Sequence, residues 1–141
     1  VEFISTHTKF LPNNLMMDST QVKSMSDFGI SIGGHTVTHP ILAKLSLENA
    51  EKEIEQGKEA LEKIIQCKVN EFAYPNGKPG QDYLPEHADM VRKAGFKTAV
   101  STLWGVSNER SDFYQLNRFT PWDKSNAKYL IRLIKNLSRV I

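Results

Sequence analysis

Apolar residues at alternating steps of three and four positions predict the clearest element of this chain, a helix from about Ser46 to Gln66. The positions on its apolar face are Leu47, Ala50, Ile54, Gly57, Leu61 and Ile64. Its opposite face is rich in Glu and Lys, so we expect that face to lie in solvent. Shorter helices are predicted between the cap residues Asp18–Thr20 and Gly29, over residues 84–94, and over residues 125–137.

Runs rich in β-branched and other apolar residues predict strands that alternate with these helices. The expected strands cover residues 1–5, 30–34, 69–74, 96–102 and, as a short one, 116–119. Residues 107–112 are polar and are expected to form a loop. Strands that alternate with helices are typical of a mostly parallel α/β fold. A length of 141 residues without a Pro/Ser-rich linker is consistent with one domain.

The amino-acid composition excludes only a few classes of function. The net charge is +2, and Lys and Arg are interleaved with acidic residues rather than clustered, so we expect no nucleic-acid partner. Cys67 is the single cysteine, which excludes an internal disulfide and a thiolate cluster for zinc. No apolar run approaches the length needed to span a bilayer. Because the chain begins at Val1 and enters a strand at once, we expect it to be a piece of a longer protein.

Two histidines four positions apart, His35 and His39, follow the strand predicted over residues 30–34. Imidazole is a common ligand of zinc and related ions, and ligands at the end of a strand are held on a rigid base. A catalytic metal usually takes three protein ligands, so this pair needs a partner. Taken alone, the two side chains could equally cap backbone groups or face solvent.

The segment Phe72-Ala73-Tyr74-Pro75-Asn76-Gly77 is the second candidate, because an apolar strand ends there in a tight turn. Such a turn can direct backbone N–H groups at a ligand and hold a developing oxyanion. Pro-Asn-Gly is also ordinary turn chemistry, and a purely structural role explains it as well.

Together the two segments resemble the metal-dependent polysaccharide deacetylases with a NodB-homology domain. Residues 32–40 are similar to the family's metal-binding motif G-S-H-T-x-x-H-P, and residues 72–77 to its groove-wall motif. Residues 94–100 and Leu116-Asn117-Arg118 resemble a later strand and the L-x-R segment of one subgroup. The resemblance runs from Val1 to about Thr120.

The resemblance implies a (β/α) barrel that hydrolyses acetyl groups from N-acetylglucosamine polymers or xylan. His35 and His39 would bind a divalent metal, zinc being the expected one, which activates water and polarises the acetyl carbonyl. The Asn76 N–H would donate to the oxyanion. Arg118 would balance a catalytic carboxylate, although an Arg at a strand end can also pair structurally. The family further suggests an acetylated polysaccharide as partner and an extracytoplasmic or cell-surface location, while the sequence itself leaves localisation open.

Two family motifs are not found in this sequence. The Thr-Phe-Asp-Asp-Gly motif, which supplies the catalytic base and the aspartate ligand, is absent, and no convincing Leu-x-x-His follows near the carboxyl end. His7 could reach the mouth of the barrel, whereas His87 is expected to face solvent. Asp112 is interpreted as solvated and Asp123 as a helix cap, with replacement of the missing carboxylates as the alternative.

Substrate contacts are expected from Tyr74, Pro75 and Trp104, since aromatic faces suit sugar rings. Core packing is the alternative for Trp104 and for Trp122.

The resulting interpretation is one partial polysaccharide deacetylase domain over residues 1–141, an α/β chain forming an incomplete (β/α) barrel whose first strand is missing. We expect the longer protein to be the active hydrolase and this piece by itself to be inactive, because the carboxylate motif is missing. The alternative is a catalytically inactive module that binds carbohydrate or metal. Because an open barrel exposes two sheet edges, we expect an oligomer or an exchanged segment.

Overall fold

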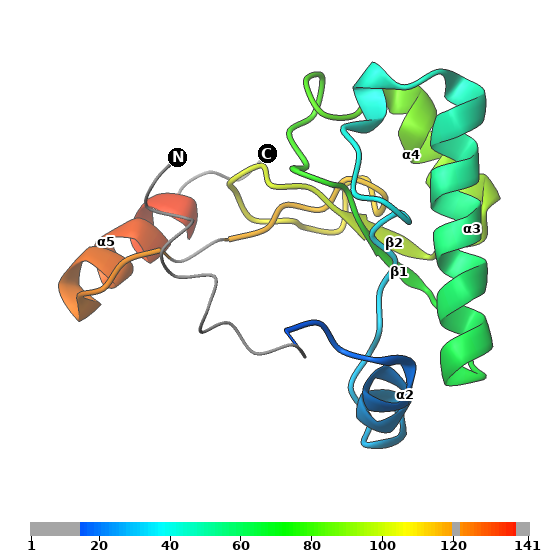
Figure 1. Cartoon of the computed structure of the whole chain (residues 1–141). Helices are drawn as coiled ribbons and strands as arrows, with labels where there is room; N and C mark the ends of the chain where they lie inside the picture. The colour runs from blue at the N-terminus through cyan, green and yellow to red at the C-terminus, as the bar shows by residue number, and fades with distance from the viewer. Residues whose placement is uncertain (1–14, 120–121, 138–141) are drawn as a thin grey trace, which may run out of the picture.

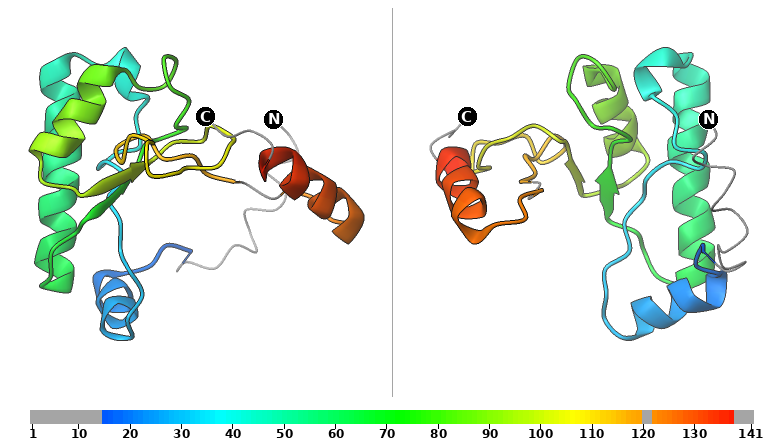
Figure 2. Two further views of the ribbon diagram at one scale, coloured as in Figure 1. Left: turned by 180° about the vertical axis from the view of Figure 1, so that it is seen from behind. Right: turned by 60° about the vertical axis from the view of Figure 1, so that its left-hand side comes forward.

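The structure, a computed structural model, describes residues 15–119 and 122–137. A small parallel sheet lies at its centre, with helices α3 (Leu47–Ile65) and α4 (Pro85–Lys93) on one side. Helix α2 (Ser19–Asp27) packs against α3, and α5 (Asn126–Leu137) lies on the opposite side of the sheet (Figures 1 and 2). The predicted strand over residues 1–5 and His7 lie outside the described residues.

Helices α2 and α3 begin directly after the N-cap residues that the sequence predicts. The Asp18 carboxylate accepts a hydrogen bond from the Gln21 N–H at 2.9 Å, and the Gln21 side chain accepts one from the Asp18 N–H at 3.0 Å, which forms a capping box ahead of α2. The Ser46 hydroxyl accepts from the Asn49 N–H at the start of α3. Helix α3 ends at Gln66, whose φ of 59° is left-handed. All four predicted helices are confirmed within a few residues.

Parallel pairing joins strands β1 (Glu71–Ala73) and β2 (Thr98–Val100), with Phe72 opposite Ala99. Single bridges extend the sheet on both sides, from Gly34 to Phe72 and from Val100 to Leu116. The order across the sheet therefore follows the order along the chain. The strands predicted over residues 30–34 and 116–119 are reduced to these bridges, because within the described residues each has a neighbour on one side only. A closed barrel is not seen in this part of the chain.

Apolar side chains of the sheet, α3 and α4 form the core, and 12 of them are buried: Leu42, Ala50, Ile54, Ile65, Val69, Phe72, Tyr74, Tyr83, Ala88, Val91, Phe96 and Ala99. Leu42 comes from a short 3-10 helix, η2 (Leu42–Lys44). Gly34 fits against this core because it has no side chain: a Cβ there would lie 2.8 Å from the Phe96 ring. The histidine segment can therefore approach β1 closely.

Two polar residues expected in solvent are buried instead. Lys58 lies within the helix face expected to be solvated, yet it is 9% exposed; its ammonium donates to Glu62 and the Val69 carbonyl and lies 4.7 Å from the centre of the Phe96 ring. His87 is 1% exposed because its Nδ1 accepts a hydrogen bond from the Leu84 N–H, which draws the ring into the first turn of α4. Its Nε2 has no partner among the described residues.

None of the helices that the structure describes has the length and apolar character needed to cross a membrane.

Candidate functional site

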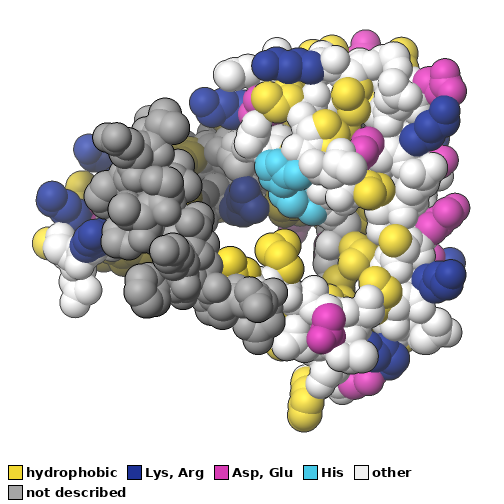
Figure 3. Space-filling view, viewed as in Figure 1, with side chains coloured by type: hydrophobic (Ala, Val, Ile, Leu, Met, Phe, Trp, Pro, Cys, Tyr) yellow, Lys and Arg dark blue, Asp and Glu magenta, His cyan; other side chains and the backbone are white. Residues whose placement is uncertain are grey.

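His35 and His39 lie side by side just beyond the Gly34 bridge. Their ring centres are 4.7 Å apart and the ring planes are inclined by 69°. Both residues are exposed, and Figure 3 shows histidine side chains as one cyan patch on this face of the molecule. The four-residue spacing therefore brings two imidazoles together without a helix between them, through a loop in which Thr36 and His39 have φ values of 64° and 59°.

The orientation of His35 is set by β1. Its Nδ1 lies 2.7 Å from the Ala73 carbonyl oxygen. A carbonyl only accepts hydrogen bonds, so Nδ1 carries the proton and donates it. The Nε2 lone pair of neutral His35 is then available for a metal ion, which is the arrangement seen for most metal-binding histidines.

Helix α3 holds the histidine loop through one carboxylate. Glu53 accepts hydrogen bonds from the N–H groups of Val37 and Thr38 and from the Thr38 hydroxyl, each at 2.8 Å. Burial raises the pKa of Glu53, but the hydrogen bonds from Thr38 and Val37 outweigh it and lower the pKa below its usual range. Gly57, one turn further along, lets the helix backbone approach Thr36.

The predicted turn after β1 is present at Pro75–Gly77. Asn76 and Gly77 have φ values of 58° and 78°, and the Gly77 N–H donates to the Pro75 carbonyl at 2.7 Å. Thr102, after β2, fixes the turn by donating its hydroxyl to the Asn76 carbonyl and its N–H to the Gly77 carbonyl, both at 2.8 Å. The Asn76 N–H has no hydrogen-bond partner within the described residues, and Asn76 is exposed.

The structure places Tyr74 and Pro75 in the core rather than on the surface beside the histidines. The Tyr74 ring stacks on Tyr83 with centres 3.7 Å apart, and its hydroxyl donates to the Tyr114 carbonyl at 2.8 Å. Burial raises the pKa of the Tyr74 hydroxyl. The strand alternation explains this position, since Phe72 and Tyr74 both face the core.

Arg118 and Trp104 are not brought into contact with the histidine pair. The Arg118 N–H donates to the Leu103 carbonyl at 3.1 Å, and its exposed side chain forms no ion pair with any residue that the structure describes. Trp104 is partly exposed and lies beside α5, where its ring lies 5.0 Å from the Arg132 guanidinium. Trp122 is 79% exposed.

Neither aspartate considered as a substitute ligand reaches the histidines. Asp112 is exposed and accepts hydrogen bonds from Tyr114 and Gln115, and the Gln115 amide is the main reason why the pKa of Asp112 is lowered. Asp123 pairs with Arg132, although a cap position was expected for it. No group of three potential ligands is found within residues 15–119 and 122–137. The two imidazoles fit a divalent ion, but they form an incomplete ligand set.

Two residues that support this site were not assigned a role from the sequence. Nothing in the sequence distinguishes Glu53 as a functional residue, because it lies among other Glu and Lys residues of a helix face. Gly57 was counted only as part of the apolar face, although a glycine inside a strong helix pattern often marks a close approach of another backbone.

The sequence model of the family described as polysaccharide deacetylase matches residues 4–99. The peptidoglycan-N-acetylmuramic acid deacetylase PdaA of Bacillus subtilis is 23% identical over 134 residues, which cover 92% of this chain and 50% of PdaA. A candidate polysaccharide deacetylase of the same organism, YxkH, is 28% identical over 98 residues, covering 70% of this chain and 34% of YxkH. The chain thus spans between a third and a half of these relatives.

Solved structures share the arrangement of parallel strands and helices. The Streptococcus pyogenes deacetylase PplD in complex with acetate superposes with a TM-score of 0.75 at 24% identity, over 85% of this chain and 51% of PplD. A polysaccharide deacetylase from Bacillus cereus superposes with a TM-score of 0.69 at 25% identity, over 86% of this chain and 37% of that protein. The fold is therefore a mixed α/β fold that matches these deacetylases over part of their length.

Proposed function

We propose that this chain, which belongs to the polysaccharide deacetylase family, carries part of the catalytic site of an enzyme that hydrolyses acetyl groups of a glycan. The observation that carries the proposal is the contact between the His35 and His39 rings, with His35 oriented by the Ala73 carbonyl. His35 contacts the Ala73 carbonyl, three residues before Asn76, and the N–H group of the exposed Asn76 has no hydrogen-bond partner among the described residues.

His35 and His39 would hold the divalent metal, with zinc as the expected ion because imidazole is one of its usual ligands. When bound, the metal supplies a Lewis acid that polarises the acetyl carbonyl and lowers the pKa of a coordinated water. The remaining ligand and the catalytic base would come from groups other than those the structure describes. Glu53 keeps both imidazoles in place by holding the loop between them.

The Asn76 N–H would donate a hydrogen bond to the oxyanion that forms when water attacks the acetyl carbonyl. Thr102 fixes the turn that carries this N–H group, because it donates hydrogen bonds to the carbonyl groups of Asn76 and Gly77. The Tyr74 and Pro75 side chains support the turn from the core. Arg118 would contribute a positive charge to a carboxylate at the mouth of the site.

The four parallel segments would form one arc of a (β/α) barrel. Their neighbours in the sheet are also neighbours in sequence, as in a barrel built from successive βα units. The outer edges at Gly34 and Leu116 are the places where further strands would add, or where a second copy of the chain would pair.

A second candidate is a binding module without catalysis. It is favoured by one observation, the absence of a third ligand within the described residues. Such a module would bind zinc weakly through two imidazoles.

The test measures zinc binding on the chain of 141 residues, and acetate release from N-acetylglucosamine oligomers on a longer protein that contains this chain together with a Thr-Phe-Asp-Asp-Gly segment. If the site is catalytic, zinc-dependent acetate release is abolished by chelator and by either H35Q or H39Q. If the chain is only a binding module, zinc binding depends on the two histidines but no acetate is released. Acetate release that survives chelator and both substitutions would overturn the proposal.

A further inference from the structure

Residues 78–83 form a short loop directly after the turn at Pro75–Gly77. The Asp82 N–H donates to the Lys78 carbonyl at 2.9 Å, which closes this loop on itself. Its far end is anchored in the core by Tyr83, which is 1% exposed. The near end is continuous with the turn that carries the candidate oxyanion donor, so whatever holds the near end also restrains the turn.

The Asp82 side chain holds this near end. Its Oδ2 accepts a hydrogen bond from the Lys78 N–H at 2.9 Å. Asp82 is 5% exposed, and its carboxylate forms no ion pair with any residue that the structure describes. A hydrogen bond to a charged acceptor is stronger than one between neutral groups, and burial strengthens it further. The Lys78 N–H is therefore firmly bound.

The hydrogen bonds around the turn leave a single backbone donor over. The Gly77 N–H donates within the turn and the Lys78 N–H donates to Asp82. Thr102 donates hydrogen bonds to the carbonyl groups of Asn76 and Gly77. From the Asn76 N–H to the Lys78 N–H, only the first of these backbone groups has no partner within the described residues. The peptide units that follow this N–H are thus held by Thr102 from one side and by Asp82 from the other.

Asp82 also contacts the segment that leaves the histidine loop. Its carbonyl oxygen accepts a hydrogen bond from the Ala43 N–H at 2.9 Å. Ala43 lies in η2 and follows His39 by four residues. Asp82 therefore bonds through its side chain to the segment beside the oxyanion donor, and through its backbone to the segment beside the metal ligands.

We propose that Asp82 is a positioning residue, which fixes the Asn76 N–H relative to His35 and His39. The catalytic consequence rests on the proposed function, whereas the restraint on the turn does not. An oxyanion donor acts only at hydrogen-bond distance from the developing charge, and a misplacement of about 1 Å can reduce a rate about a hundredfold. Because Asp82 is buried, it acts through the turn rather than by touching the substrate.

The first test records NMR spectra of the chain of 141 residues without metal, so it does not depend on hydrolysis. D82A removes the acceptor of the Lys78 N–H, while the backbone carbonyl at position 82 can still accept from Ala43. We expect the Asn76 amide signal to shift and the exchange of the Gly77 N–H with solvent to quicken by about tenfold or more. The zinc affinity of D82A should stay unchanged, because Glu53 holds the histidine loop independently.

Two variants separate the hydrogen bond from other effects of the substitution. D82N keeps an acceptor of similar shape without the charge, so the Gly77 N–H should exchange within about threefold of the wild-type rate. Because D82N also removes a buried carboxylate without an ion pair, it should be no less stable than the wild type.

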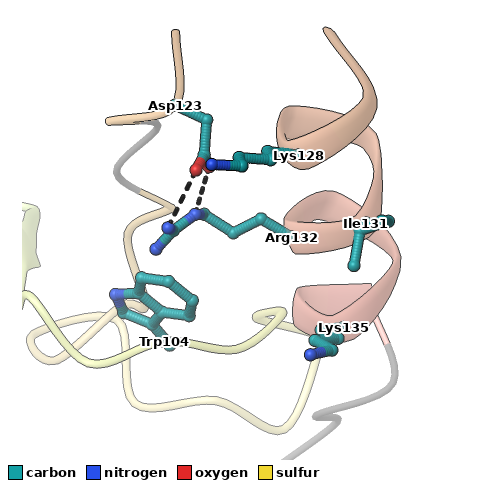
Figure 4. Close-up of a pocket in the computed structure, with 6 residues that line it drawn as sticks. All are labelled: Trp104, Asp123, Lys128, Ile131, Arg132 and Lys135. Atoms are coloured by element: carbon teal, nitrogen blue, oxygen red, sulfur yellow. Dashed lines mark hydrogen bonds and ion pairs between the residues drawn. The ribbon is translucent and has the colours of Figure 1, made fainter. Parts of the chain in front are cut away.

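D123A is the matched control. The Asp123 side chain is only 9% exposed and binds Arg132 (Figure 4), and it contacts neither the turn nor the histidine loop. Exchange of the Gly77 N–H should be unchanged in D123A, and circular dichroism verifies that every variant is folded.

The second test measures acetate release by a longer, active protein that contains this chain. We expect D82A to lower kcat by about ten- to a hundredfold with KM changed by less than about twofold, because the donor acts in the transition state. D82N should retain most of the activity. A purely structural role predicts instead that folded D82A keeps the wild-type kcat.

Unchanged exchange of the Gly77 N–H in folded D82A, an unchanged kcat, or a D82N variant that behaves like D82A would overturn the inference. If the wild-type longer protein releases no acetate, the proposed function fails, and the exchange measurement alone then decides whether Asp82 positions the turn.

Discussion

Gly57 of α3 lies directly against the backbone of Thr36: a Cβ atom added to Gly57 would be 3.0 Å from the Thr36 carbonyl carbon and 3.1 Å from its oxygen. The long helix thus contacts the loop that carries both histidines at a point where a Cβ atom would fit only if the Thr36 backbone moved by a few tenths of an ångström. The conformation of the candidate metal site therefore depends on a residue that lies about three turns into helix α3.

Substitution G57A tests this dependence. Alanine favours the helix by about 1 kcal/mol over glycine, while overpacking against the Thr36 backbone costs roughly 1–3 kcal/mol. We expect a net loss of stability on the order of 1 kcal/mol, together with weaker zinc binding because the loop shifts. Chemical denaturation and zinc titration measure the two effects. E59A, at an exposed position of the same helix, is the control and should leave zinc affinity unchanged.

Substitution E53Q removes the carboxylate that receives three hydrogen bonds from the histidine loop. Hydrogen bonds to a charged group contribute about 1.5–3 kcal/mol each when buried, and Glu53 is partly exposed, so we expect a total loss of about 1–3 kcal/mol near neutral pH. Because the folded-state pKa of Glu53 is below its ordinary value of 4.5, its contribution is complete above that pH and declines as the pH falls below it. The stability difference between wild type and E53Q should therefore shrink in acid. A difference that stays constant from neutral pH down to about pH 3 would contradict this assignment.

His87 should make the stability of the chain sensitive to mild acid. Burial lowers its pKa in the folded state below the ordinary value of 6.5, so the unfolded chain binds a proton first as the pH falls. Its contribution to stability is complete above about pH 6.5 and is lost progressively below it. Unfolding measured from about pH 8 to about pH 5 should show the decline in wild type.

Two variants separate titration from capping at this position. H87Q can still accept the Leu84 N–H but cannot titrate, so we expect a flatter pH profile with little loss at neutral pH. H87L also removes the slope, but it leaves the Leu84 N–H without its acceptor and should be less stable than H87Q. A slope that persists in both variants would assign the acid sensitivity to another group.

Substitutions at Asn76 test whether the backbone N–H of the turn, rather than the side chain, acts on the oxyanion. Because Asn76 has a φ of 58°, N76G should be tolerated. N76A should cost about 1 kcal/mol or more, because alanine lacks the polar side chain that lets asparagine adopt the left-handed conformation. Both variants keep the backbone N–H. The assay compares acetate release by wild type and N76G in a longer protein that contains this chain and is active. If the backbone N–H acts on the oxyanion, N76G retains acetate release. A loss of release in folded N76G would assign the function to the Asn76 side chain instead.

The sequence predicted the helices well because their signals are local. The caps Asp18 and Ser46 and the apolar periodicity of α3 depend only on neighbouring residues. Strand lengths were overestimated, because a strand extends only as far as another chain segment pairs with it, and residues 30–34 and 116–119 each have one described neighbour. His87 was placed in solvent because its neighbours are acidic, although its place three residues after Leu84 is the reciprocal position of a capping box.

The spacing of His35 and His39 was enough to predict that the two side chains could share a site, but it did not predict the orientation of the His35 ring. The bond from His35 to the Ala73 carbonyl depends on the register that sets Gly34 opposite Phe72, and register is a property of two distant segments. Two further contacts also form only when the chain folds, and the local sequence does not predict them: Gly57 with Thr36, and Asp123 with Arg132. For this reason the role of Glu53 in holding the histidine loop could not be predicted from the sequence.

The neighbour order of the sheet has a consequence for biosynthesis. Among the described residues, each later parallel segment pairs with the one that precedes it: Phe72 with Gly34, Ala99 with Phe72, and Leu116 with Val100. A ribosome that releases these residues one after another delivers every new strand to a partner that has already left the exit tunnel. Chain elongation and sheet growth can therefore proceed in the same direction, without waiting for a distant carboxyl-terminal partner.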